Sequence, residues 1–457
     1  MCDDMALPAA FSGGDVVFTV RRREPELVTP AKPTPHELKL LSDIDDQDGF
    51  RFQMPAIHFY GHKTSMRGKD PAQVIKNALA QALVFYYPIA GRLREGDGRK
   101  LMVDCNGEGV MFIEADADVS LHQFGDPLHP PFPYFDDLLY KVPGSEGLLN
   151  CPLLTIQVTR LKCGGFIFAH SLSHTISDGP GMFQFLNAVA EIAGGASEPS
   201  VAPVWRRELL SARDPPRVTC THREYEQLPN NNDPIWTQES IVHHSFFFGP
   251  KKLEAIRQLF SPYNNGEHTT RFEALTAFLW RCRTKALQLE SSEEVRFLCV
   301  SNIRGKSNPP LLPPGYYGNA FVYPAAVTTA GKLCENPLGY ALELVKKAKA
   351  EATVEYIQSV ADLMVIKGRP GFTMRGTWSV SDISRLGFRD VDFGWGKAVY
   401  GGPATAGTDD FQGLSYYVRC QNAKGEECIV VPCSLPLNAM KRFIHEVDQV
   451  LGELDLL

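Results

Sequence analysis

Two histidines and an aspartate stand four residues apart in FIFAHSLSHTISDGPG, residues 166–181. On a helix, His170, His174 and Asp178 would share one face, because side chains at this spacing lie above one another. Such a set could bind zinc or iron. Alternatively, one histidine could act as a general base, since a neutral imidazole accepts a proton near neutral pH. The spacing alone leaves both chemistries open.

The residues around the three side chains argue against a helical metal site. FIFAHSLSH reads as a strand that follows a glycine turn, and the serines and threonines between the histidines and Asp178 are weak helix formers. We expect the helix to begin only after Gly179-Pro180. In a strand followed by a loop the three side chains would not converge, so we expect no metal site.

The H-x-x-x-D pattern is weak evidence by itself, since a second copy runs from His122 to Asp126. Context separates the two. His174 stands where a buried strand gives way to a loop of small residues before a helix, which is a usual place for catalytic groups. His122 lies in a polar run before a proline-rich segment, and we interpret it as a surface residue. His170 we interpret as a core histidine that takes no part in a reaction.

Composition limits the possible partners and compartments of the chain. The 457 residues carry a net charge of -7, which argues against nucleic acid as a partner. No apolar run reaches about 18 residues, so we expect no membrane span. The acidic start, MCDDMALPAAFSGGD, does not resemble a leader peptide. Eleven cysteines without a C-x-x-C pair indicate reduced thiols and a cytoplasmic protein. The C-terminal sequence LDLL differs from the usual peroxisomal signal S-K-L.

The pattern of elements predicts an α/β protein in two parts. In the first part we expect a helix from Asp70 to about residue 85, a hairpin of residues 100–116 around NGEG, strands on both sides of Gly164-Gly165, and a helix over 182–195. A polar segment, 206–237, resembles a linker. After it come a strand near 243–248, helices over 251–260 and 270–287, and a final helix over 438–451. The predicted domains are therefore 1–205 and 238–457, joined by the linker 206–237.

A second unusual string, DVDFGWGKAVYGGP, covers residues 390–403. Its glycines allow close backbone approach, and we expect a packed loop in which Asp392 holds a cation or an amide. HTISDG in mid-chain together with DFGWG about sixty residues from the end resembles the plant BAHD acyltransferases, which use acyl-coenzyme A donors. LSDIDDQ, ALVFYYPIAGRL, PPGYYGNAF and VADLMVIKGRP extend the resemblance, towards the alcohol acyltransferase branch, over nearly the whole chain.

This resemblance implies a fold and a reaction. The fold would be α/β, with two chloramphenicol-acetyltransferase-like domains of mixed β-sheets joined by a long crossover loop, and the protein would be a monomer. His174 would lie midway along a channel between the domains. There would be no bound cofactor and no metal; a coenzyme A thioester would be the co-substrate and a small alcohol the acceptor. The implied reaction carries benzoyl from benzoyl-coenzyme A to benzyl alcohol, giving benzyl benzoate.

The resemblance also implies roles for individual residues. His174 would be the general base, Asp178 would pair with Arg304 rather than orient the histidine, and Asp392 is a second candidate partner of that arginine. Gly179 would leave room for the thioester. The remaining residues are Asn319 bracing the channel, Gly394, Trp395 and Gly396 of the DFGWG motif, and Thr270, Ser381, Asp382 and Ser384 for coenzyme A.

Other functions on the same scaffold stay open. The donor could be acetyl or hydroxycinnamoyl coenzyme A, and the acceptor could be an amine. The chain could also be a catalytically silent binding protein, although the intact His174 and Gly179 argue against this.

Overall fold

The computed structural model of the protein describes residues 16–132, 135–144, 148–226, 241–263, 268–407, 412–422 and 424–454. The acidic start of the chain, for which we expect no leader, lies outside these ranges. So does the end of the predicted linker, from residue 227 onward. Within the described ranges no helix is both long and apolar enough to cross a membrane.

The first large sheet contains seven strands in the order β1-β7-β8-β9-β4-β16, with β2 also paired to β7. Neighbouring strands run antiparallel except β7 and β8, which are parallel. The antiparallel pairing of β8 and β9 confirms the predicted turn at Gly164-Gly165. The strands are β1 (Val20–Arg22), β2 (Glu26–Val28), β4 (Gln53–Tyr60), β7 (Val110–Ala117), β8 (Leu154–Leu161), β9 (Phe166–Ser173) and β16 (Tyr400–Gly402).

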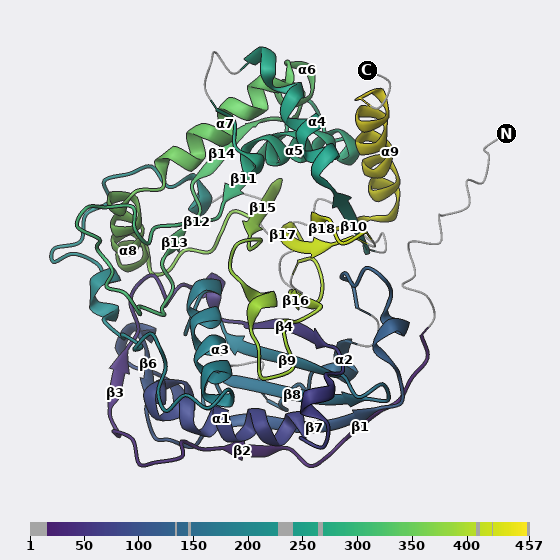
Figure 1. The fold of residues 1–457 in the computed structure, drawn as a ribbon. Helices are drawn as coiled ribbons and strands as arrows, with labels where there is room; N and C mark the ends of the chain where they lie inside the picture. Colours follow the sequence, from purple (N-terminus) through teal and green to yellow (C-terminus); the bar gives the residue numbers. More distant parts are fainter. Residues whose placement is uncertain are drawn as a thin grey trace.

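Helices α1 (Pro71–Phe85) and α3 (Gly179–Ala193) pack side by side on this sheet (Figure 1). The predicted start of α1 is confirmed, because the Asp70 carboxylate accepts a hydrogen bond from the backbone N–H of Ala72 at 3.2 Å and Pro71 occupies the first position. The buried face of α1 contains Ile75, Ala78, Leu79, Ala82 and Leu83. This face packs in the core against the strands and against α3.

The hairpin predicted around NGEG is wrong. Residues 101–104 form β6 (Leu101–Asp104), which pairs with β3 (Leu38–Leu40) and β5 (Arg92–Glu95) in a separate three-stranded sheet, whereas β7 joins the large sheet. Gly109 has φ +98°, and a Cβ there would lie 2.5 Å from the carbonyl oxygen of Val28. The chain therefore turns towards β2 at this glycine, and alternation in the sequence cannot reveal that change of partner.

The second large sheet has the order β10-β18-β17-β15-β11-β14, in which β15 runs parallel to both β11 and β17. Helix α5 (Arg271–Leu287) joins this sheet through ring contacts: the Trp280 and Phe297 centroids are 5.9 Å apart, and those of Phe297 and Trp378 are 5.7 Å apart. The strands are β10 (Ile241–Phe248), β11 (Glu294–Cys299), β14 (Ala325–Thr329), β15 (Thr377–Asp382), β17 (Leu414–Gln421) and β18 (Glu427–Pro436). A two-stranded ribbon of β12 (Ser301–Asn302) and β13 (Phe321–Val322) lies apart from it.

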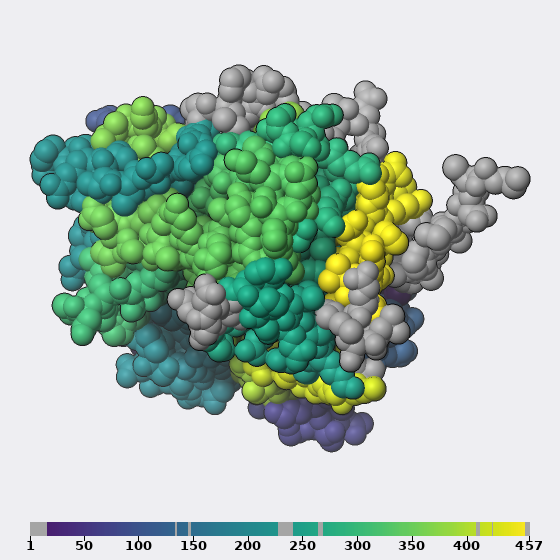
Figure 2. All heavy atoms as spheres, turned by 90° about the horizontal axis from the view of Figure 1, so that it is seen from above, coloured from purple at the N-terminus to yellow at the C-terminus, as the bar shows by residue number. Residues whose placement is uncertain are grey.

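Residues of the second half, coloured from teal through green to yellow, make up most of the coloured surface seen in Figure 2. The helices of this half lie above its sheet in Figure 1. They are α4 (Pro250–Leu259), α5 (Arg271–Leu287), α6 (Ala330–Glu335), α7 (Leu338–Glu351), α8 (Val354–Lys367) and α9 (Leu437–Leu454); the short α2 (Phe135–Leu138) belongs to the first half. The predicted mixed α/β architecture with two sheet-rich halves is confirmed.

Strand β16 joins the two halves. Its three residues come late in the chain, yet they pair antiparallel with residues 57–59 of β4 at the edge of the first sheet (Figure 1). The boundaries at residues 205 and 238 stay a prediction. Because β16 crosses back, the space between the two sheets is bounded by residues from both ends of the sequence.

Candidate active site

A cavity of about 650 Å³ lies between the two halves. The first half contributes His170, His174, Asp178 and Gly179 to its wall, and the second contributes Ser381 and Asp382. Volumes of this size are typical of sites for small molecules and cofactors. The cavity therefore brings together six of the residues that the sequence singled out.

His174 follows directly after β9, where the strand has ended and α3 has not begun. Its backbone N–H donates to the carbonyl of Phe52 at 2.9 Å. The imidazole stacks on the ring of Phe50, with centroids 4.8 Å apart and planes 11° apart, and Phe52 meets it edge-on at 5.2 Å. These contacts hold the ring in one orientation at the cavity wall, with 9% of the residue exposed.

Burial lowers the pKa of His174 below its ordinary value of 6.5. The backbone carbonyl of His174 itself and the Asp178 carboxylate act in the opposite direction, without cancelling the effect of burial. The imidazole is therefore neutral at neutral pH, which is the form that accepts a proton.

Asp178 also lines the cavity, but the hydrogen bonds of its carboxylate come from groups other than His174. Its carboxylate receives two hydrogen bonds from the Arg304 guanidinium, at 2.7 and 3.1 Å, so the predicted pair is present. It also accepts from the backbone N–H groups of Gly181 and Ala320, both at 3.0 Å. The first of these caps α3, and the second ties the helix start to the other half of the chain. With four donors around it, Asp178 is a structural anchor of the loop.

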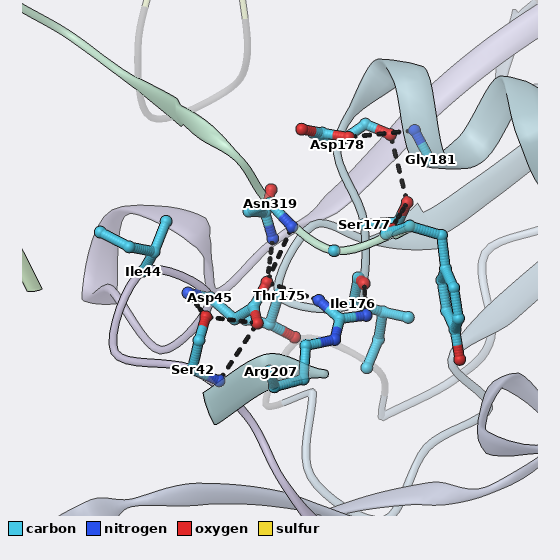
Figure 3. A network of polar contacts seen from close by, with 12 residues as sticks. Ser42, Ile44, Asp45, Thr175, Ile176, Ser177, Asp178, Gly181, Arg207 and Asn319 are labelled. Atoms are coloured by element: carbon cyan, nitrogen blue, oxygen red, sulfur yellow. Dashed lines mark hydrogen bonds and ion pairs between the residues drawn. The ribbon is translucent and has the colours of Figure 1, made fainter. Parts of the chain in front are cut away.

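A second buried network holds the backbone of the His174 segment (Figure 3). Asn319 donates through its side-chain nitrogen to the carbonyl of His174 and to Asp45 Oδ1, each at 2.8 Å. Arg207 donates to the same Asp45 oxygen and to the carbonyl of Ile176, each at 2.8 Å. The Asp45 carboxylate raises the pKa of Arg207 against the opposing effect of burial, so this arginine stays charged. Asn319, expected to brace the channel, lies behind the histidine rather than in the cavity wall.

Three of the four residues expected at the coenzyme A site meet at the start of α5. The Ser384 hydroxyl donates to Asp382 Oδ1 at 2.6 Å, and Arg271, next to Thr270, donates to the Ser384 hydroxyl at 2.8 Å. Thr270 caps α5, accepting from the backbone N–H of Glu273 at 3.3 Å. Ser381 lies nearby on β15 and lines the cavity, whereas Thr270 and Ser384 do not.

The DFGWG turn lies outside the cavity. Asp392 accepts hydrogen bonds from the backbone N–H groups of Gly394 and Gly396, both at 2.7 Å, so it is not a partner of Arg304. The two glycines adopt φ +108° and +90°, which a residue with a side chain reaches only with strain. Trp395 packs edge-on against Phe166 at 5.3 Å, and Phe393 lies 5.0 Å from Phe168. The two aromatic rings of the motif therefore pack this loop against β9 of the first sheet.

The three side chains of the opening pattern do not converge. His170 is within β9, His174 follows the strand, and Asp178 caps α3. Throughout the part of the chain that the structure describes, no three His, Cys, Asp or Glu side chains cluster as metal ligands. His170 differs from the satisfied core histidine expected, because it lines the cavity and both of its ring nitrogens lack a hydrogen-bond partner among the described residues.

Comparisons with known proteins identify the family of the chain. Residues 18–450 match the model of the Transferase family. The chain belongs to this family, that of the BAHD acyltransferases. It is 61% identical over 438 residues to benzyl alcohol O-benzoyltransferase from Petunia hybrida and 62% identical over 438 residues to the enzyme of that name from Nicotiana tabacum, in each case over 96% of this chain and 95% of the relative. As a BAHD family member it is an acyltransferase.

Solved structures show the same fold at low sequence identity. Vinorine synthase matches with a TM-score of 0.73 and 23% identity over 94% of this chain and 98% of that one. TRI101 from F. sporotrichioides, solved with coenzyme A and T-2, matches with a TM-score of 0.67 and 16% identity over 91% and 98%. The BAHD fold is therefore retained although most side chains differ.

Sequence reasoning missed two members of the buried network, Asp45 and Arg207. Asp45 lies in LSDIDDQ, a segment that contributed to the resemblance without a role of its own. Arg207 lies at the start of the segment that we interpreted as a polar linker, yet it is only 1% exposed. Nothing in WRRELL distinguishes this buried arginine from its exposed neighbour Arg206.

Proposed function

We propose that this BAHD acyltransferase transfers benzoyl from benzoyl-coenzyme A to benzyl alcohol. The observation that carries the proposal is His174. Its neutral imidazole is fixed by aromatic contacts at the wall of a cavity between the two halves of the chain. The substrate pair is taken from the two relatives named benzyl alcohol O-benzoyltransferase, each more than 60% identical.

The reaction needs a base more than it needs a covalent intermediate. A thioester is already activated, whereas an alcohol holds its proton at neutral pH. His174 removes the hydroxyl proton as the alcohol oxygen attacks the acyl carbon. The carbon–sulfur bond then breaks, and the departing thiolate takes the proton back from the imidazolium. One ester and one coenzyme A thiol form for each thioester and alcohol consumed.

The two buried networks keep the base in position during this cycle. Asn319 and Arg207 hold the carbonyls of residues 174 and 176, while Arg304 holds Asp178. Proximity of two bound substrates supplies a large share of a rate enhancement only if the base does not drift, since a misplacement of about 1 Å can cost about 100-fold. We infer that holding the His174 segment is the purpose of these buried charges.

The coenzyme A end of the channel is proposed to lie beside Ser381, Asp382 and the start of α5. Support comes from Arg271, which is 34% exposed and brings a positive charge to a segment where the phosphates would pass. Gly179 would then face the thioester. A Cβ at this position would lie 2.8 Å from Leu386 Cδ1, so even a methyl group would press on the opposite wall.

The test is an assay of the purified chain with benzoyl-coenzyme A and benzyl alcohol. Release of free thiol together with benzyl benzoate, identified by mass spectrometry, supports the proposal, and His174→Ala should abolish both while leaving the fold intact. A matrix of acetyl, benzoyl and hydroxycinnamoyl donors against alcohols and amines then ranks the substrates. If no pair releases thiol, the alternative of a silent binding protein is favoured.

We further propose that the enzyme acts as a monomer in the cytoplasm. The monomeric state is what the resemblance to the BAHD acyltransferases implies. All ten cysteines in the described ranges have free thiols, including Cys420 and Cys428, whose sulfurs lie 3.5 Å apart. Light scattering after size exclusion tests the first point, and the location of a fluorescent fusion tests the second.

A further inference from the structure

His170 is a polar side chain in the cavity wall to which neither the motif nor the proposed reaction gives a role. It lies in β9, opposite Ala56 of β4 and Ile156 of β8. Only 1% of the residue is exposed, and it lines the same cavity as His174. The strand between the two histidines spans at most about 13 Å. Both histidines therefore face one cavity from the same strand and the residue that follows it.

Both ring nitrogens of His170 lack a hydrogen-bond partner among the described residues. Its ring neighbours are Phe168 and His58, each with a centroid 5.5 Å away, and neither satisfies it. Buried polar groups are almost always hydrogen-bonded, because an unmatched one costs about 1–3 kcal/mol. The side chain therefore has unused donor and acceptor capacity facing a space that a substrate occupies.

The chemistry of the missing partner follows from the state of the imidazole. Burial lowers the pKa of His170 well below its ordinary value, and the neighbouring His58 adds to the effect. A neutral imidazole has one N–H donor and one nitrogen acceptor. A hydroxyl group complements either nitrogen, because it can both donate and accept. Since a neutral ring adds no charge, it has no particular preference for carboxylates or ammonium groups.

The rest of the cavity wall favours an aromatic body for the molecule that carries this hydroxyl. Side chains that line the same cavity include the apolar set Met54, Met182, Leu386 and Phe388. A ring would fill this apolar part, and one oxygen substituent would reach the imidazole. Such a division, an apolar pocket with few polar groups, is the usual way in which a small-molecule site sets specificity.

We propose that His170 is a specificity-determining residue that hydrogen-bonds to a hydroxyl substituent on the aromatic ring of a substrate. This inference rests on the proposed acyl transfer and refines its substrate class. The hydroxylated ring belongs either to the alcohol, as in a hydroxybenzyl alcohol, or to the acyl group, as in a hydroxybenzoyl thioester. Among such isomers, the enzyme prefers the one whose hydroxyl reaches His170 over the unsubstituted compound.

The test compares kcat/KM for 2-, 3- and 4-hydroxybenzyl alcohol with that for benzyl alcohol, using benzoyl-coenzyme A as donor. A second arm compares 2- and 4-hydroxybenzoyl-coenzyme A with benzoyl-coenzyme A, using benzyl alcohol as acceptor. The variant is His170→Leu, which removes both nitrogens from an apolar wall. We expect the preference for at least one hydroxylated compound to fall about tenfold, as for loss of one hydrogen bond. Because His170 lines the cavity, each ratio is taken against the same variant's kcat/KM for benzyl alcohol and benzoyl-coenzyme A. The arm that responds identifies which substrate His170 contacts.

His58→Leu is the matched control. His58 is equally buried, it is the ring neighbour of His170, and it does not line the cavity. We expect its substrate ratios to stay within twofold of those of the unmodified enzyme. His170→Gln, which keeps a donor and an acceptor, should retain part of the preference. If His170→Leu does not fold, His170→Phe gives the same comparison with a planar ring.

Two outcomes overturn the inference. One is that His170→Leu leaves every ratio in both arms within twofold of the unmodified enzyme, which would show that His170 binds only water. The other is that His58→Leu lowers the ratios as much as His170→Leu does, which would show a general effect on the strand. Both outcomes require an enzyme that is active on unsubstituted substrates, so they are distinct from a failure of the proposed function, in which no thiol would be released at all.

Discussion

Replacing Arg304 by methionine should reduce stability more than it reduces chemistry. The substitution removes both guanidinium bonds to Asp178, at 2.7 and 3.1 Å, and a third bond from the guanidinium to the carbonyl of Gly318 at 2.6 Å. The Asp178 carboxylate, 2% exposed, would keep only its two bonds from the backbone N–H groups of Gly181 and Ala320.

The size of the effect follows from these contacts. Loss of one partner from a buried ion pair costs about 3–5 kcal/mol. The Arg304 side chain is 21% exposed and two backbone donors remain on Asp178, so we expect a smaller loss of about 2–3 kcal/mol in the free energy of unfolding. Thermal unfolding followed by circular dichroism should show a melting temperature several degrees lower. Initial rates measured well below that temperature should fall less than in His174→Ala.

Arg213→Met is the matched control for Arg304→Met. Arg213 is 20% exposed and binds the fully buried Asp362 at 2.6 Å, but neither residue lines the cavity. This control should lose stability and keep its kcat/KM at low temperature. The reasoning would be refuted if Asp178→Ala melted normally and yet lost activity as completely as His174→Ala, because the carboxylate would then act in the reaction itself.

Three further predictions concern the residues around the base. The pH profile of kcat/KM should fall on the acid side with a midpoint below 6.5, because His174 accepts a proton only when neutral and burial lowers its pKa. A midpoint above 6.5 would contradict this. Asn319→Ala should lower kcat about 10- to 100-fold with little change in KM, because it removes the hydrogen bond to the His174 carbonyl and does not alter the cavity wall. Steady-state kinetics test this, and a change in KM alone would point to a substrate contact. Gly181→Ala should lower the melting temperature, because the added Cβ would lie 2.1 Å from the carbonyl oxygen of Tyr317 and the backbone must shift; unchanged melting would contradict that packing.

The sequence predicts those parts of the molecule that depend on local pattern. The start of α1 follows from Asp70 and Pro71, and the β8–β9 turn follows from two glycines. The sequence does not predict which strands pair when the partner strand is distant in the chain. The alternating residues 101–104 and 110–117 are both strands, but their pairing with β3 and with β1 is set by packing that no local pattern encodes.

The same limit applies to the site. Asp178 and Arg304 were matched through the family resemblance, not from their separation of 126 residues. The sequence does not reveal that Arg207 is buried, because an arginine in a polar stretch is normally solvated. Its burial depends on the ion pair with Asp45. The sequence predicts a core role for His170, because a histidine in an apolar strand normally has its hydrogen bonds satisfied there. Only the cavity shows that this one is not.

The position of the base depends on both halves of the chain. The His174 segment lies between β9 and α3, but the groups that hold it are Asp45 and Arg207 on one side and Arg304 and Asn319 on the other. The edge strand β16 of the same sheet also comes from beyond residue 399. A fragment of residues 1–205 would lack Arg207, Arg304, Asn319 and β16, so its histidine would have the right neighbours in sequence without the contacts that orient it. Activity should therefore require both halves, either in one chain or as two associated fragments, even though the motif with the base lies entirely within the first half.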